Sequence, residues 1–171
     1  MANRNALHAI GLNEIHLTAL RAGVLLRWMS STEVRSQNEL TAFGFAKDYD
    51  AIVTVRTDIG ERKFALEYER SPKSAKVYKA IAGCISQEVR VNRLLYLATN
   101  YDILRFVSDF FTETDFPAFF GLVPDWHSQL LEMPVLDGHA RRTFPLRQAL
   151  NRSVGKGDTV RAATSYSLPF H

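Results

Sequence analysis

The chain has 171 residues, of which 46% are hydrophobic and 23% are charged. These are ordinary globular values, so they exclude a disordered or fibrous protein. One cysteine, Cys84, excludes a disulfide framework and a cysteine-based zinc site. No run of 18 apolar residues occurs, and the start lacks the apolar core of a signal peptide. We therefore expect a cytoplasmic protein with no membrane partner.

Charge is unevenly distributed along the chain. Residues 1–138 carry 15 Lys and Arg against 17 Asp and Glu, whereas residues 139–171 carry 6 against 1. We expect a single domain over residues 1–150 and a basic, flexible tail over residues 151–171. Such a tail can contact nucleic acid, although a simple solvated end has the same composition.

The first half of the chain predicts two helices followed by a hairpin. Apolar residues recur with helical spacing over residues 6–28, and Gly11 and Gly23 are candidate helix ends. Ser30 and Glu33 form a capping-box pattern that predicts a second helix over 31–40. Apolar runs over 50–56 and 62–69 are separated by a turn with one glycine, which predicts two antiparallel strands.

The second half alternates helices and strands. Ser71 and Pro72 predict the start of a helix that ends near Glu88, and the apolar run over 93–98 is typical of a buried strand. An amphipathic helix over 101–111 and a strand over 119–123 follow, and the signals weaken from residue 124. This order predicts an α/β fold with a mixed sheet flanked by helices.

Three carboxylates are the strongest candidates for chemistry. Asp50 opens the first strand of the hairpin, and Glu67 and Glu69 lie near the end of the second. Because strand side chains alternate, both glutamates point to one face, and a register that brings Asp50 opposite would create a Mg²⁺ site. The alternative is that both glutamates face solvent beside Arg70 and Lys73.

Basic residues follow these acids within ten positions: Arg70, Lys73, Lys76 and Lys79. They are candidate DNA contacts, but on a helix each step of three turns about 60°, so one phosphate does not reach all four. Lys73 lies nearest the acids, whereas Lys76 and Lys79 also fit a solvated helix face. The five histidines lack metal-ligand spacing and are interpreted as surface or helix residues.

The segment from Asp50 through Glu67-Tyr-Glu69-Arg70-Ser71-Pro72-Lys73-Ser74 to Tyr78 resembles the core of the PD-(D/E)XK nuclease superfamily. More narrowly, it resembles plasmid replication-relaxation proteins and the related mobilisation relaxases. The resemblance covers roughly residues 7–100. It implies a restriction-endonuclease-like core and a Mg²⁺- or Mn²⁺-dependent DNA endonuclease or nickase-like activity.

The resemblance also implies roles for individual residues. Asp50 and Glu67 would be metal ligands, and Glu69 falls where many nucleases of the superfamily carry the catalytic lysine. Lys73 is the nearest substitute for that lysine. Glu14, on the first helix, is a candidate additional carboxylate.

Two other functions remain open. Glu69 at the lysine position favours a non-catalytic DNA-binding or protein-interaction module on the same fold. The acidic segment 102–137, with seven acids and one arginine, fits a protein partner without any nucleic acid. A homodimer is a further candidate assembly.

Overall fold

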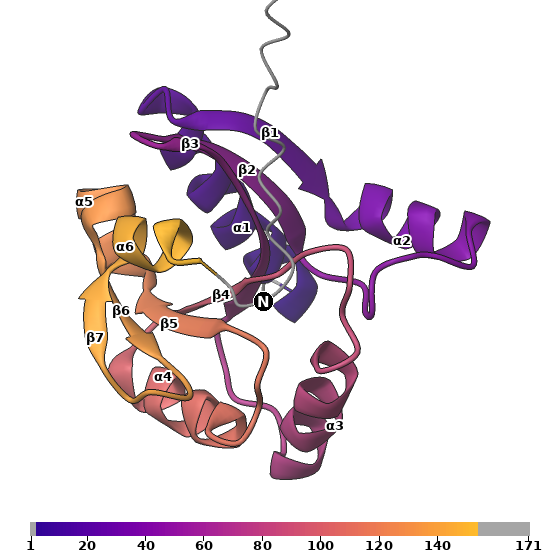
Figure 1. Cartoon of the computed structure of the whole chain (residues 1–171). Helices are drawn as coiled ribbons and strands as arrows, with labels where there is room; N and C mark the ends of the chain where they lie inside the picture. The colour runs from indigo at the N-terminus through magenta and orange to yellow at the C-terminus, as the bar shows by residue number, and fades with distance from the viewer. Residues whose placement is uncertain (1–2, 154–171) are drawn as a thin grey trace, which may run out of the picture.

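The structure is a computed structural model that describes residues 3–153. Seven strands form one sheet in sequence order, with helices on both faces (Figure 1). Strands β3, β4 and β5 are parallel to one another, and every other neighbouring pair is antiparallel. The predicted α/β fold with a mixed sheet is therefore confirmed. The elements are α1 (Arg4–Arg21), β1 (Leu25–Ser30), α2 (Ser31–Leu40), β2 (Ala51–Thr57), β3 (Gly60–Glu69), α3 (Ala75–Ile85), β4 (Leu94–Ala98), α4 (Tyr101–Ser108), β5 (Ala118–Leu122), α5 (Val123–Gln129), β6 (Pro134–Asp137), β7 (Thr143–Pro145) and α6 (Leu146–Asn151).

The predicted hairpin is confirmed as β2 and β3. Gly60, at a φ of 121°, opens β3 in a backbone conformation that favours glycine. The register pairs Ala51 with Leu66 and Ile52 with Ala65. It therefore brings Asp50, just before β2, alongside Glu67. The backbone N–H of Asp50 donates a hydrogen bond to Glu67 Oε1 at 3.3 Å.

Helix α2 and the later parallel strands also agree with the sequence. Ser30 Oγ accepts a hydrogen bond from the backbone N–H of Glu33, so the capping prediction for α2 is confirmed. Strand β4 is buried along its whole length between β3 and β5, which explains its unbroken apolar sequence. Helix α4 and β5 also form close to their predicted positions.

The long helix predicted over residues 6–28 is wrong in its last third. Helix α1 ends at Arg21, and Gly23 adopts a left-handed φ of 72° that turns the chain. The residues that follow pair with β2 as strand β1. Tertiary pairing here outweighs a local pattern that also fits a helix. Gly11, proposed as a helix end, instead lies in the middle of α1.

Helix α3 begins three residues later than predicted. Ser74 is its N-cap, and Ser74 Oγ accepts from the backbone N–H of Val77. Pro72 and Lys73 therefore lie in the connection before the helix, not in its first turn. The helix ends at Ile85, short of Glu88. The short elements α5, β6, β7 and α6 were not predicted from sequence.

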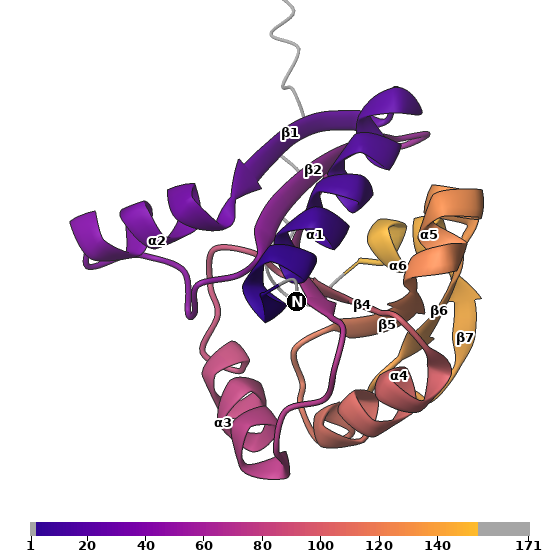
Figure 2. The ribbon, with the colours of Figure 1, turned by 180° about the vertical axis from the view of Figure 1, so that it is seen from behind.

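The sheet separates two hydrophobic cores, and the ribbon seen from behind shows the helices that lie on either side of the sheet (Figure 2). Helices α2, α3 and α4 cover one face, and α1, α5 and α6 cover the other. On β3, Phe64, Leu66 and Tyr68 belong to the α1 side, whereas Ala65 belongs to the α3 side. Strand alternation then places Glu67 and Glu69 together on the α3 side, as predicted.

Residues 154–171, which hold most of the predicted basic tail, lie outside the described part of the chain. Within residues 3–153, no helix combines the length and the apolar character needed to cross a membrane.

Candidate functional site

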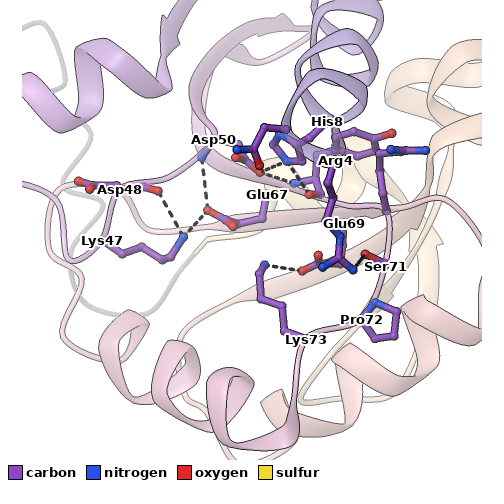
Figure 3. Close-up of a pocket in the computed structure, with 13 residues that line it drawn as sticks. Arg4, His8, Lys47, Asp48, Asp50, Glu67, Glu69, Ser71, Pro72 and Lys73 are labelled. Carbon is purple, nitrogen blue, oxygen red and sulfur yellow. Dashed lines mark hydrogen bonds and ion pairs between the residues drawn. The ribbon is translucent and has the colours of Figure 1, made fainter. Parts of the chain in front are cut away.

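A polar pocket of about 640 Å³ lies where β2 begins and β3 ends (Figure 3). Four segments form its walls: the first turns of α1, the loop that precedes β2, the end of β3, and the connection from β3 to α3. The side chains that line it are Arg4, Asn5, His8, Lys47, Asp48, Asp50, Glu67, Tyr68, Glu69, Arg70, Ser71, Pro72 and Lys73. Four of these residues are acidic, and they come from two segments that the hairpin register brings together.

Glu67 is a buried acid that forms an ion pair with a lysine. Glu67 is 5% exposed, and its Oε1 lies 2.6 Å from Lys47 Nζ. Burial raises the pKa of Glu67, because the charged form loses its hydration there. The Lys47 ammonium opposes this pKa rise, and the nearby Asp50 charge adds to it. A buried carboxylate beside another acid is thus only partly compensated by its lysine.

Glu69 forms a second, separate ion pair. Glu69 is 6% exposed, and its Oε2 lies 2.8 Å from Lys73 Nζ. The backbone N–H of Lys73 donates to the hydroxyl of Tyr78 at 3.0 Å, and Lys73 Nζ lies 5.8 Å from the centre of the Tyr78 ring. Because Tyr78 is fully buried in α3, it fixes the segment that carries Lys73.

Asp50 joins the hairpin to the first helix. Its Oδ2 accepts the backbone N–H of Tyr68 at 2.8 Å and lies 3.4 Å from His8 Nε2. The same His8 nitrogen lies 3.1 Å from the Tyr68 carbonyl oxygen, so both of its neighbours are acceptors. The hydrogen bond to Asp50 raises the pKa of His8, and burial opposes that rise. The geometry therefore favours a proton on Nε2.

The loop that carries Lys47 is held by a buried carboxylate outside the pocket. Glu88 Oε2 accepts the backbone N–H of Ala46 at 2.8 Å and the hydroxyl of Tyr49 at 2.9 Å. Its other oxygen accepts the backbone N–H groups of the two residues that follow it. Glu88 therefore ties the Lys47 loop to the loop after α3.

The structure brings together most, but not all, of the predicted site. Asp50, Glu67, Glu69, Arg70 and Lys73 all line the pocket. The remaining three candidates are exposed and do not line it: Glu14 on α1, and Lys76 and Lys79 on α3.

Sequence reasoning missed the residues that approach from other segments, chiefly Arg4, His8 and Lys47. Arg4 donates to Ser71 Oγ at 2.7 Å, which closes one side of the pocket. The histidine spacing predicts a surface or helix residue at His8, yet His8 contacts Asp50. Among these three residues, only Lys47 lies close in sequence to a predicted site residue, because it precedes Asp50 by three positions.

The charges of the pocket decide how it can hold a cation. Among residues 3–153, no group of three or more His, Cys, Asp or Glu side chains is placed so that it could hold a metal ion. Each central carboxylate instead faces a basic group, namely Lys47, Lys73 or His8. Oxygen donors of this kind suit Mg²⁺ or Mn²⁺, and a divalent ion would stabilise the charged form of Glu67 against the burial that raises its pKa.

A comparison with protein-family models, curated proteins and solved structures found no match for this chain.

Proposed function

We propose that this protein is a metal-dependent DNA endonuclease or nickase-like domain with a restriction-endonuclease-like core, of the kind that serves plasmid mobilisation or replication relaxation. The support from the fold is the mixed sheet flanked by helices, with its polar pocket at the ends of β2 and β3. The proposal also rests on the resemblance of residues 50–78 to the PD-(D/E)XK pattern.

The observation that carries the proposal is the meeting of Asp50 and Glu67. The two residues are joined by the hydrogen bond from the Asp50 backbone to the Glu67 carboxylate, and Glu69 follows on the same strand face. Asp50 and Glu67 would hold Mg²⁺ or Mn²⁺, and Glu69 would hold the ion or a water molecule. When bound, the ion supplies Lewis acidity toward the phosphate and lowers the pKa of a water molecule.

The lysines and the pocket walls provide the remaining chemistry. Lys73, and Lys47 from the opposite wall, would place positive charge beside the phosphate or the attacking water. Water oxygen would bond to phosphorus, the bond from phosphorus to one ester oxygen would break, and the departing oxygen would take up a proton. Arg70 lines the same pocket and would contact a neighbouring phosphate.

The test is cleavage of supercoiled and single-stranded DNA with Mg²⁺ or Mn²⁺. We expect cleavage that EDTA stops and that Glu67→Gln reduces by at least about a hundredfold, because one ligand charge is lost. Lys79→Gln is the matched control, since Lys79 is exposed outside the pocket, and it should retain activity. No cleavage with either ion, or full activity in Glu67→Gln, would refute the proposal.

A non-catalytic DNA-binding module is the second candidate. It is favoured by the ion pairs that already neutralise Glu67 and Glu69 without a metal. This function predicts DNA binding that weakens with salt and produces no cleavage.

A further inference from the structure

A second cationic surface lies on the sheet beyond the pocket. The strand register aligns Arg27 of β1, Thr54 of β2 and Lys63 of β3 in one row across three strands. Neighbouring strands are about 4.8 Å apart, so the backbones of Arg27 and Lys63 are separated by roughly 10 Å. Both side chains are exposed. We call Arg27, Lys63 and Arg90 the cationic cluster, because Arg90 from the loop after α3 joins them.

Two of these cations, Lys63 and Arg90, lie near the ring of Phe45. The Arg90 guanidinium lies 4.2 Å from the centre of the Phe45 ring, and Lys63 Nζ lies 5.8 Å from it. Phe45 itself is buried in the core, which makes it a fixed platform. Stacking on an aromatic ring orients a guanidinium but leaves its charge uncompensated.

The cluster is not neutralised within the described chain. In residues 3–153, no ion pair joins Arg27, Lys63 or Arg90 to a carboxylate. Arg90 instead donates to the neutral Gln37 side chain at 3.0 Å. Partial burial, and then the charges of Arg90 and Arg27, lower the pKa of Lys63, with Glu88 opposing them. An anion from outside the chain would offset this repulsion between like charges.

The cluster and the pocket lie along the same strand. Lys63 and Glu67 are four residues apart on one face of β3, so their backbones are separated by roughly 13 Å. The loop from Phe45 to Lys47 links the two places, because Phe45 contacts the cluster and Lys47 contacts Glu67. An extended polyanion that crosses the row at Lys63 and then follows β3 would therefore reach the pocket.

We propose that the cationic cluster binds the sugar–phosphate backbone of the nucleic acid whose phosphodiester enters the pocket. This inference rests on the proposed function and states where on the protein the nucleic-acid substrate would lie. A nucleic-acid strand carries a phosphate for about every 3.4 Å of helix axis, so a few nucleotides are enough to span the roughly 10 Å between Arg27 and Lys63. The hydroxyl of Thr54, between Arg27 and Lys63, is a further donor to phosphate oxygen.

The experiment measures binding of a fluorescently labelled oligonucleotide by anisotropy, with the full chain and with EDTA present. Lys63→Gln and Arg27→Gln should each weaken binding roughly three- to tenfold and reduce the slope of log affinity against log salt by about one. The double variant should reduce the slope by about two. Arg21→Gln is the control, because Arg21 is an exposed cation at the end of α1, which packs on the opposite face. It should change affinity little.

The outcomes separate this inference from the proposed function. Weaker binding in the cluster variants would support the cluster even if no variant cleaved DNA, since the assay contains no free metal. Binding by Arg27→Gln/Lys63→Gln equal to that of Arg21→Gln would overturn it. It would also be overturned if a labelled polyglutamate peptide bound as tightly as DNA and with the same losses, because the cluster would then serve an acidic protein partner.

Discussion

The pKa of His8 is raised by a contact with Asp50, which lies 42 positions further along the chain. Its Nε2 faces Asp50 Oδ2 and the Tyr68 carbonyl oxygen, and it is only half-buried. A folded-state pKa above the unfolded value means that the protonated ring stabilises the fold. This contribution is fully present below the ordinary pKa of about 6.5 and is lost as the pH rises through the raised pKa.

We therefore predict that Asp50→Asn lowers the pKa of His8, because the charged acceptor is removed while burial remains. Imidazole proton NMR titration of both proteins measures this change directly. Asp48→Asn is the matched control, since Asp48 lines the same pocket but pairs with Arg35 and Asn38. In urea titrations, His8→Gln should cost more stability at pH 5.5 than at pH 8.5. An unchanged His8 titration in Asp50→Asn would show that the contact is absent in solution.

The residues of the site differ in how far sequence could predict them. Strand alternation alone predicts that Glu67 and Glu69 share a face, whereas the sequence left open the hairpin register that brings Asp50 beside Glu67. Lys47 and His8 could not be derived in this way. Lys47 lies in an irregular loop, and His8 depends on the angle at which α1 crosses the sheet, which no local pattern contains.

At the scale of elements, the contact of α1 with β3 depends on a glycine. A methyl group at Gly11 would come within 2.3 Å of the Tyr68 hydroxyl and 2.6 Å of its ring. Helix α1 can therefore approach β3 this closely only because position 11 has no side chain. The same approach places His8 against Asp50.

We predict that Gly11→Ala lowers the free energy of unfolding by roughly 1–3 kcal/mol, since the overlap with Tyr68 outweighs the better helix propensity of alanine. Gly83→Ala on α3 is the control, because a methyl group there meets nothing within 4 Å. It should raise stability by roughly 0.5–1 kcal/mol. Equilibrium urea unfolding compares the two, and a gain in both variants would contradict the packing argument.

The elements that sequence predicted well share a strong local signal. The hairpin has a glycine turn, α2 has its serine cap, and β4 has an apolar run that only a strand buried on both faces needs. Strand β1 was missed because its apolar residues also suit a helix, and pairing with β2 decides between the two. Elements β6 and β7 have four and three residues, too few to establish a period.

At the scale of the whole molecule, β3 connects the two cores. Phe64 and Leu66 pack on the α1 side, whereas Ala65 packs on the α3 side of the same strand. Neither core can lose its packing without exposing side chains of this strand. The described part of the chain should therefore unfold as one cooperative unit.

The two tryptophans report on this cooperativity from different places. Trp28 lies on the edge strand β1, stacked on His16 at 4.3 Å, and Trp126 is buried in α5, donating to the Ile15 carbonyl. We predict that Trp126 fluorescence in Trp28→Phe, and Trp28 fluorescence in Trp126→Phe, each share a urea midpoint with the circular dichroism of the same variant. Separate midpoints within either variant would show that the two halves unfold independently.

Glu88 connects the pocket and the cationic cluster through hydrogen bonds to the backbone on both sides. One of its oxygens holds the backbone at Ala46, next to Lys47, and the other holds the backbone of Arg90. A displacement of Arg90 toward a bound phosphate would pull on the same carboxylate that positions the Lys47 loop. The position of Lys47 in turn determines how close its ammonium lies to the Glu67 carboxylate. If the cluster holds a phosphate and the pocket a cation, any effect of the first on the affinity for the second would be returned by the same factor, because linkage between two binding events is reciprocal.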